Sequence, residues 1–303
     1  MTMILYLVLP CFNEQEILIS SAKILRNRLE NLIDKKIICK KSKILFVDDG
    51  SKDNTWNIIE NLNRENNIFC GIKLSRNYGH QNALLCAFLD AKKKSDAVIC
   101  IDADLQDDID IINIMIEKFI NNNCEIVYGV RNSRESDNFF KKITAELFYK
   151  IQIFLGCEII FNHADFRLMS KRVLDSLENF EERNLFLRGI IPMIGFKSCE
   201  IKYSRKKRKA GKTKYNLKRM LLLAINGVVN LTIKPIRMIE ILGLIILLFG
   251  LLLIFLIRSK LICLLIIFDG LIIFSLGIIG EYIGNILFEI KKRPRYFIEK
   301  KIE

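Results

Sequence analysis

The stretch Ile99-Cys-Ile-Asp102-Ala-Asp104-Leu-Gln106-Asp107 decides how this chain folds. Its apolar first half is typical of a buried strand in a parallel sheet. Open α/β sheets bind ligands at the carboxyl ends of such strands, and alternate residues of an extended chain point the same way. Asp102, Asp104 and Gln106 therefore converge on one point if the chain stays extended. The alternative is a strand followed by a helix start that the acidic residues of 107–110 cap.

A converging set of oxygen ligands suits Mg²⁺ or Mn²⁺, which proteins usually hold beside substrate phosphates. Zinc is not expected, because the chain has only two histidines and its nine cysteines form no CxxC pair. Several cysteines lie inside apolar runs, where a free thiol behaves as a small hydrophobic group. We therefore expect reduced cysteines and a cytosolic location for the soluble part of the chain.

Short apolar runs alternate with helical patterns over residues 1–130, as in successive βαβ units. Strands are predicted at 4–9, 43–47, 68–74, 97–101, 125–130 and 164–169, and helices at 14–32, 53–65, 80–93 and 108–121. Polar loops at 13–14, 48–49 and 102–104 follow strands and should gather at one sheet edge. Since the GxGxxG and Walker A patterns are absent, this acidic edge indicates a nucleotide-sugar transferase.

The second half of the chain is basic and then strongly apolar. The chain has 303 residues and a formal charge of +13, and residues 202–219 hold ten Lys or Arg without an acid. Such a run favours a phosphorylated ligand or an anionic membrane surface. Residues 239–257 and 261–281 are each close to the ~20 apolar residues that cross a bilayer. Because this membrane segment follows the basic run, nucleic acid is not expected as a partner.

These patterns predict four parts. They are a catalytic domain at 1–214, an amphipathic interfacial helix at 215–237, a transmembrane hairpin at 238–284 and a basic cytoplasmic tail at 285–303. Basic flanks put the catalytic domain on the cytoplasmic side of an inner (cytoplasmic) membrane, in a multi-pass protein. Glycines in the spans permit close helix packing and favour a homo-oligomer, such as a tetramer.

Several motifs, read in order, are shared with one known family. They are Leu9-Pro-Cys-Phe-Asn-Glu14, Val47-Asp-Asp-Gly-Ser-Lys-Asp53, Leu74-Ser-Arg-Asn-Tyr-Gly-His-Gln81, Ile101-Asp-Ala-Asp-Leu-Gln-Asp107, Ala164-Asp-Phe-Arg-Leu-Met-Ser170 and Phe186-Leu-Arg-Gly189. Over nearly its whole length the chain resembles family 2 glycosyltransferases of the polyprenyl-phosphate type, similar to bactoprenol glucosyltransferases and dolichyl-phosphate mannosyltransferases. The resemblance implies an α/β fold of the GT-A (Rossmann-like) type.

The resemblance also implies roles for individual residues. The nucleotide-sugar pocket would contain Pro10, Glu14, Asp49 and Asp102, and Mg²⁺ or Mn²⁺ would be bound by Asp102, Asp104 and Gln106. The catalytic residues would be Asp104 and Asp165. The donor and lipid phosphates would contact Arg131, Arg134, Arg205, Arg208 and Lys214.

The implied reaction is inverting transfer of a sugar from a UDP-sugar, with glucose favoured, to undecaprenyl phosphate. A phosphate acceptor is already anionic at pH 7, so Asp165 either acts in catalysis or orients groups and holds Arg167. Two alternatives remain. A processive polysaccharide synthase is disfavoured because the sole tryptophan, Trp56, cannot form a QxxRW motif. A non-catalytic membrane scaffold is disfavoured by the intact acidic motifs.

Overall fold

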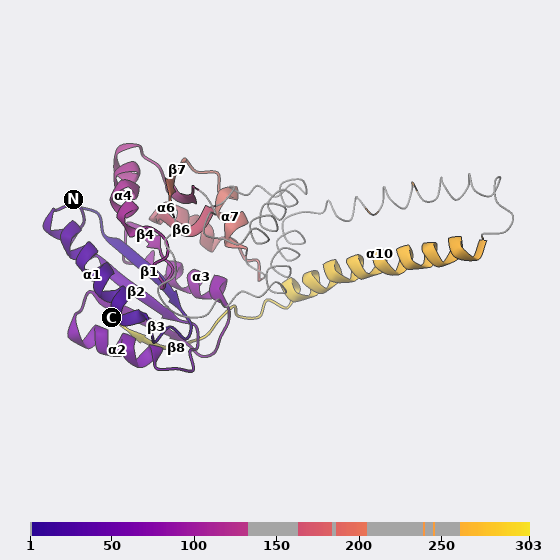
Figure 1. Cartoon of the computed structure of the whole chain (residues 1–303), viewed down its shortest axis with the longest axis horizontal. Coiled ribbons are helices and arrows are strands. Elements are labelled where there is room, and N and C mark those ends of the chain that lie inside the picture. Colours follow the sequence, from indigo (N-terminus) through magenta and orange to yellow (C-terminus); the bar gives the residue numbers. More distant parts are fainter. Residues whose placement is uncertain (1, 133–162, 184–185, 205–238, 240–244, 246–260) are drawn as a thin grey trace.

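The computed structural model describes residues 2–132, 163–183, 186–204, 239, 245 and 261–303. These residues form an α/β domain around one eight-stranded mixed sheet with the strand order β7-β5-β6-β4-β1-β2-β3-β8 (Figure 1). Strands β4, β1, β2 and β3 are mutually parallel, whereas β6 and β8 run antiparallel to their neighbours.

The elements follow one another along the chain as β1 (Leu5–Cys11), α1 (Leu18–Asp34), β2 (Lys43–Asp48), α2 (Thr55–Glu65), β3 (Phe69–Leu74), α3 (His80–Ala91), β4 (Ala97–Cys100), the short 3₁₀ helix η1 (Ile109–Ile111), α4 (Ile112–Asn121), β5 (Ile126–Arg131), β6 (His163–Ser170), α6 (Lys171–Glu178), α7 (Leu187–Met193), β7 (Ser198–Tyr203), α10 (Leu261–Ile290) and β8 (Ile298–Ile302).

Helices cover both faces of the sheet and create two hydrophobic cores. In β1, Leu5, Leu7 and Leu9 belong to the core that contains α1, α2 and α4. Tyr6 and Val8 belong to the opposite core, which contains α3, α6 and α7. Because side chains alternate along a strand, a strand with apolar residues at every position can supply both cores. The apolar runs of the sequence therefore correspond to a doubly covered sheet.

The six predicted strands are confirmed as β1 to β6, with ends that differ by one or two residues. The four predicted helices are confirmed as α1 to α4, although α4 begins only at Ile112, after η1. The predicted interfacial helix at 215–237 lies outside the described residues, and so does the first span at 239–257 except for positions 239 and 245. The prediction did not include β7 or β8.

Helix α10 covers the whole of the second predicted span, 261–281, and projects away from the sheet (Figure 1). Where its side chains are described, large apolar ones such as Ile272, Leu276 and Ile283 are more than half exposed. Among the residues that the structure describes, no helix is both long enough and apolar enough to cross a membrane. The C-terminal end of α10 is joined to the domain, where Glu289 accepts hydrogen bonds of 2.8 and 2.7 Å from the Arg183 backbone N–H.

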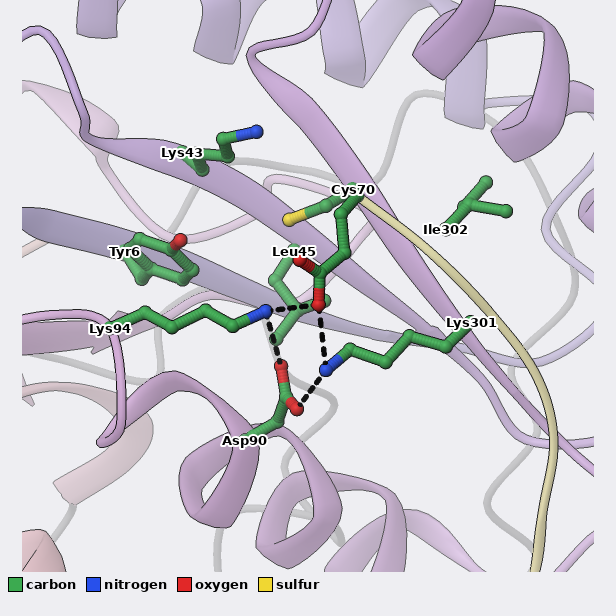
Figure 2. A pocket seen from close by; sticks show the side chains of 9 residues that line it. Tyr6, Lys43, Leu45, Cys70, Asp90, Lys94, Lys301 and Ile302 are labelled. Atoms are coloured by element: carbon green, nitrogen blue, oxygen red, sulfur yellow. Dashed lines mark hydrogen bonds and ion pairs between the residues drawn. The ribbon is translucent and has the colours of Figure 1, made fainter.

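The predicted basic tail ends in a strand. Residues of β8 pair antiparallel with β3, so that Ile72 lies opposite Lys301. Four charged residues fasten this strand to the end of α3; we call them the C-terminal clip. They are Asp90, Lys94, Lys301 and Glu303, with Lys301 Nζ at 2.6 Å from Asp90 Oδ1 and at 2.9 Å from Glu303 Oε1 (Figure 2).

The C-terminal clip borders a small cavity of about 60 Å³ (Figure 2). Tyr6 and Lys43 line it, and they belong to the first residues of β1 and β2. The cavity thus lies at the amino ends of these strands, opposite the edge where α/β sheets bind ligands. Its volume is also far below the ~300 Å³ of a typical ligand pocket. We therefore treat it as part of the packing around β8.

The structure contains a disulfide between Cys124 and Cys199. Cys199 lies in β7 and pairs with Val127 of β5, whereas Cys124 comes just before β5. The parallel pairing of these two strands brings the cysteines together across 75 residues of sequence. The expectation of reduced cysteines is therefore wrong for this pair. Among the described residues, five other cysteines are free thiols, four of them buried.

Candidate active site

The polar loops that follow β1 and β2 meet at one edge of the sheet, as predicted. Asp49, directly after β2, accepts hydrogen bonds of 2.7 and 2.9 Å from the backbone N–H groups of Tyr78 and Gly79, which lead into α3. Gly50 has a φ of +65°, and a Cβ there would lie 2.3 Å from the backbone carbon of Arg76. Only glycine permits this close approach of the two loops.

The loop after β1 is fixed by side chains from the loop after β2. Asn13 has a left-handed φ of 52°, and its backbone N–H donates to Ser51 Oγ at 2.9 Å. The Asn13 side chain in turn accepts from the Lys52 N–H at 2.9 Å. Glu14 is held in the same way, because its N–H donates to Thr55 Oγ1 at 2.9 Å. The predicted nucleotide residues Glu14 and Asp49 thus belong to two interlocked loops.

The segment after β4 does not stay extended. Strand β4 ends at Cys100, and a turn follows in which the Leu105 N–H donates to the Asp102 carbonyl at 3.1 Å. Leu105 adopts a left-handed φ of 46°, which reverses the chain. The Gln106 N–H donates to Asp104 Oδ1 at 3.3 Å. The prediction that residues 102–106 stay extended is therefore wrong. The turn, and not strand alternation, determines the spacing of the Asp102, Asp104 and Gln106 side chains.

The acidic residues after this turn have separate structural roles. Asp108 accepts from the Asp110 N–H at 3.4 Å and so caps η1, as the alternative interpretation of this stretch expected. Asp107 is only 2% exposed. It accepts a hydrogen bond of 2.6 Å from the Tyr203 hydroxyl and one of 3.2 Å from Arg131 Nη2. Arg131, predicted to contact a phosphate, is thus paired with an internal carboxylate.

The predicted catalytic residue Asp165 is the centre of a buried ionic group. Its Oδ1 accepts from Arg167 Nη2 at 2.6 Å and from Arg188 Nε at 3.1 Å. Its Oδ2 accepts from Arg188 Nη2 at 3.0 Å and lies 3.3 Å from His80 Nε2. We call these four residues the Asp165 cluster. Both carboxylate oxygens are therefore fully engaged by cationic donors.

Burial divides the Asp165 cluster into an inner and an outer part. The side chains of Arg167 and Asp165 are 1% and 7% exposed, whereas those of His80 and Arg188 are 31% and 34% exposed. Arg167 Nη1 is buried without a hydrogen-bond partner in the described part of the chain. His80 and Arg188 are thus partly exposed to solvent, whereas Asp165 and Arg167, which hold them, are buried.

The protonation states of the cluster follow from these contacts. Burial opposes ionisation of Asp165, yet Arg188, His80 and Arg167 hold the pKa of its carboxyl well below the usual value. Burial alone would lower the pKa of His80, but the hydrogen bond and charge of Asp165, together with the charge of Asp102, raise it. Asp165 is therefore a stable anion that favours a protonated His80.

Asp102 lies in the turn of residues 102–105, which we call the DxD turn, and connects it with the Asp165 cluster. Strands β4 and β6 are antiparallel neighbours with Cys100 opposite Arg167, and Asp102, just beyond the end of β4, lies close enough to Asp165 and His80 for their charges to act on it. Burial raises the pKa of Asp102 to about 6; His80 opposes this increase, and nearby acids, Asp165 among them, add to it.

Not every predicted site residue can be placed. Arg134, Arg205, Arg208 and Lys214 lie outside the residues that the structure describes. Pro10 lies near the end of β1, opposite Val47 of β2. The predicted binding and catalytic roles of all these residues remain predictions.

Three polar residues of this region were not assigned a role from sequence: His80, Arg188 and Tyr203. His80 and Arg188 belong to quoted motifs, Leu74–Gln81 and Phe186–Gly189, so a signal was present. Their shared partner was not visible, because His80 and Asp165 are 85 residues apart and no local spacing links them. Tyr203 lies in the unpredicted strand β7 and had no such signal.

Comparison with known proteins agrees with this geometry. The family model described as Glycosyl transferase family 2 matches residues 6–178. The chain is 49% identical to the uncharacterized glycosyltransferase YkoT of Bacillus subtilis, covering 98% of this chain and 91% of that protein. It is 34% identical to the prophage bactoprenol glucosyl transferase homolog of Escherichia coli, covering 97% and 98% of the two chains.

A solved structure also shares the fold. A mycobacterial protein of known crystal structure aligns with a TM-score of 0.50 at 12% identity, covering 75% of this chain and 73% of that one. At this identity the likeness concerns the fold alone. The family match spans more than half of the chain, from β1 to the end of α6, and includes the DxD turn and Asp165. The chain therefore belongs to glycosyltransferase family 2 and is a glycosyltransferase with a GT-A-like α/β fold.

Proposed function

We propose that the protein transfers a sugar from a UDP-sugar to undecaprenyl phosphate at the cytoplasmic face of the membrane. Glucose is the favoured sugar. The observation that carries this proposal is the match at 34% identity, over 97% of the chain, to proteins named bactoprenol glucosyl transferase. Since the match includes the C-terminal third of the chain as well as the sheet, it supports a shared acceptor and not merely a shared fold.

The arrangement of the sheet edge supports separate donor and acceptor sides. In the strand order, β1 and β2 lie on one side of β4, and β6 lies on the other. The loops that hold Glu14 and Asp49 would take the nucleotide, and the Asp165 cluster would face the acceptor. Asp102 and Asp104 lie between them. An acceptor phosphate oxygen would attack the anomeric carbon as the bond to the UDP oxygen breaks, which inverts the configuration at that carbon.

The residues after β4 fit a divalent metal ion that arrives with the donor. In the described part of the chain, no group of three or more His, Cys, Asp or Glu side chains could hold a metal ion by itself. Mg²⁺ and Mn²⁺ need only one or two carboxylates when substrate phosphates and water complete the shell. Asp102 and Asp104 would supply the carboxylates and Gln106 an amide oxygen. When bound, the ion would neutralise the charge that develops on the departing diphosphate.

Membrane attachment belongs to the same proposal. Helix α10 exposes Ile and Leu side chains along its length, including Leu265, Ile279 and Ile290. A helix with such a surface is unfavourable in water and suits the hydrocarbon of a bilayer. Residues 202–219 would then lie near anionic headgroups. The membrane location, the topology and the homo-oligomeric state remain predictions.

The direct test uses purified protein in detergent, undecaprenyl phosphate, Mn²⁺ and a panel of radiolabelled nucleotide sugars. We expect a lipid-linked product with UDP-glucose. The panel includes UDP-N-acetylhexosamines, UDP-galactose and a nucleotide-linked modified arabinose. Product with one of these would change the sugar but keep the acceptor. Absence of a lipid-linked product with every donor would contradict the proposal.

Two variants test the metal role. Asp104→Asn should reduce turnover by roughly 10²- to 10³-fold, the scale expected when an electrostatic contact to the leaving group is lost. Gln106→Ala should raise the Mn²⁺ concentration needed for half-maximal activity. Asp110→Asn is the matched control, because Asp110 lies in the same segment and pairs with Arg28 at the surface. Full activity of Asp104→Asn would exclude its metal role.

A further inference from the structure

The segment between α10 and β8 contacts the loop that precedes α3. Ser75 comes directly after β3, and its N–H donates a hydrogen bond of 3.0 Å to the carbonyl of Phe297, directly before β8. The Ser75 hydroxyl lies 3.0 Å from the Tyr78 hydroxyl, and the Phe297 backbone also interacts with that hydroxyl. Phe297 therefore contacts both Ser75 and Tyr78 of this loop.

The same loop supplies the backbone donors that hold Asp49. Tyr78 and Gly79 each donate an N–H to one carboxylate oxygen of Asp49, at 2.7 and 2.9 Å. Burial raises the pKa of Asp49, and these two N–H groups oppose the increase, so they favour the ionised carboxylate. A shift of the loop would change both contacts at once. Phe297 is thus linked to Asp49 through Ser75 and Tyr78.

The pairing of β8 with β3 changes register beside this contact. Lys73 and Leu74 of β3 lie opposite residues 300 and 298 of β8. Glu299 is therefore the extra residue of a β-bulge. Bulges bend a strand and are common next to active sites, where they end the pairing or redirect a side chain. The regular pairing of β8 is thus interrupted next to the loop that holds Asp49.

The side chains of the segment are buried unequally. Phe297 and Ile298 are 56% and 47% exposed, so their side chains contribute little to a core. Tyr296 packs against the core that contains α3, as Tyr78 does, and its hydroxyl interacts with the Cys86 thiol of α3. Tyr296 therefore holds the segment on α3, and the backbone of Phe297 contacts the loop.

We infer that Tyr296 and Phe297 are positioning residues of the donor site. Tyr296 seats the segment on α3, and the Phe297 backbone holds the loop whose N–H groups fix Asp49. This inference rests on the proposed function, in which the loop that holds Asp49 takes the nucleotide. If the segment served stability alone, its loss would not weaken donor binding selectively. Donor affinity is therefore the quantity that distinguishes the two roles.

The main test uses Tyr296→Ala in the full-length protein. Affinity for UDP with Mn²⁺ is measured by calorimetry, and the KM for undecaprenyl phosphate is measured at saturating UDP-sugar. We expect the UDP Kd to rise roughly 3- to 10-fold, as for the loss of one hydrogen bond, with the acceptor KM within about twofold of wild type. Thermal unfolding in detergent verifies that each variant is folded.

Two further variants serve as controls. Tyr296→Phe keeps the ring that packs on α3 and should bind UDP nearly as the wild type does. Lys301→Ala changes β8 at its other end, where the side chain pairs with Asp90 and Glu303, and it should leave UDP affinity unchanged. An equal loss of UDP affinity in Lys301→Ala and Tyr296→Ala would overturn the inference.

A double-mutant cycle tests the route through the loop. Tyr78→Phe removes the hydroxyl contact with Ser75 but keeps the N–H that donates to Asp49. If Tyr296 acts through this loop, Tyr296→Ala should weaken UDP binding less in the Tyr78→Phe background than in the wild type. Two effects that multiply independently would overturn the inference.

Ser75→Ala keeps the inference testable if Tyr296→Ala does not fold. Ser75 is exposed, so this change leaves the core intact and removes only the hydroxyl contact with Tyr78. It should raise the UDP Kd and leave the acceptor KM unchanged. Unchanged UDP affinity in both Ser75→Ala and Tyr78→Phe would overturn the inference.

UDP binding requires no acceptor, so this inference can fail separately from the proposed reaction. If the wild type forms no lipid-linked sugar but binds UDP, and Tyr296→Ala binds it more weakly, the reaction fails while the inference stands. If the wild type forms the product and folded Tyr296→Ala binds UDP equally well, the inference fails while the reaction stands. A wild-type protein that binds no UDP would contradict both.

Discussion

The two ends of helix α3 contact two ionic clusters with opposite purposes. His80, at its first turn, belongs to the Asp165 cluster, and Asp90, at its last turn, belongs to the C-terminal clip (Figure 2). The Asp165 cluster contains side chains as little as 1% exposed, whereas Lys301 and Glu303 of the clip are 33% and 58% exposed. Buried ionic groups are expensive to form and exposed ones are nearly neutral. This difference indicates that the Asp165 cluster serves function, whereas the C-terminal clip only holds β8 in place.

The sharpest test of this contrast replaces the central acid of each cluster. Asp165→Asn should destabilise the protein by about 3–5 kcal/mol, because it leaves the buried Arg167 without its counter-charge. Activity should fall with it, since Arg188 and His80 lose their shared anchor. Thermal unfolding in detergent and transfer of radiolabelled sugar measure the two effects.

The matched variant is Asp90→Asn in the C-terminal clip. It should lower the free energy of unfolding by no more than about 1 kcal/mol, because its lysine partners are about one-third exposed to solvent, and it should leave sugar transfer unchanged. Equal losses of stability and of sugar transfer in Asp165→Asn and Asp90→Asn would contradict the distinction between the two clusters.

A second buried contact gives an effect of intermediate size. Tyr203→Phe removes the 2.6 Å hydrogen bond to Asp107 but keeps the ring that packs edge-on against Phe166. The free energy of unfolding should decrease by about 1.5–3 kcal/mol, because the hydrogen bond is made to a buried carboxylate. Arg131 still pairs with Asp107, so the acid is not left alone. An unchanged unfolding midpoint would mean that this hydrogen bond contributes nothing.

The pH dependence of stability offers a smaller effect with a defined sign. Folding raises the pKa of His80, so its contribution is complete below the unfolded value of ~6.5 and is lost as pH rises through the folded value. Asp165 stays ionised throughout this range, because its pKa is lowered. The difference in unfolding midpoint between wild type and His80→Gln should therefore be larger at pH 5.5 than at pH 9. A difference that grows with pH would contradict the assignment.

The smallest effect is expected at the end of the chain. Lys301→Ala removes ion pairs to Asp90 and Glu303, but Lys301 also pairs through its backbone with Ile72. We expect the free energy of unfolding to decrease by less than about 1 kcal/mol. High salt should weaken the wild-type clip and reduce even this difference. A loss comparable to that of Asp165→Asn would show that the clip is more than a fastening.

How far the sequence predicts this molecule depends on whether a feature is local. Strands β1 to β5 were predictable because each is an apolar run bounded by turn residues, and the DxD turn follows one of them. Strand β8, Ile-Glu-Lys-Lys-Ile, is mostly charged and exposed, so neither alternation nor hydropathy reveals it. The turn at Leu105 depends on a single left-handed residue that no spacing pattern marks.

The candidate site shows the same limit. Asp102, Asp104 and Asp165 could be singled out, because each lies within a short motif. The sequence could not reveal the ion pair between Arg131 and Asp107 or the disulfide between Cys124 and Cys199, because both depend on which strands become neighbours. Charge pairing of this kind is set by the tertiary fold. Sequence therefore identified the chemical groups but not their partners.

The strand order has one mechanical consequence. Strands β7 and β8 are the two outermost strands, and the chain between them, residues 204–297, contains the proposed membrane part. The catalytic domain would thus be suspended from two anchor points, roughly 34 Å apart for seven inter-strand spacings. A body suspended in this way can rock about the line between its anchors but cannot spin. The active edge would keep one bearing toward the lipid surface, and the contact between Arg183 and Glu289 would reinforce it.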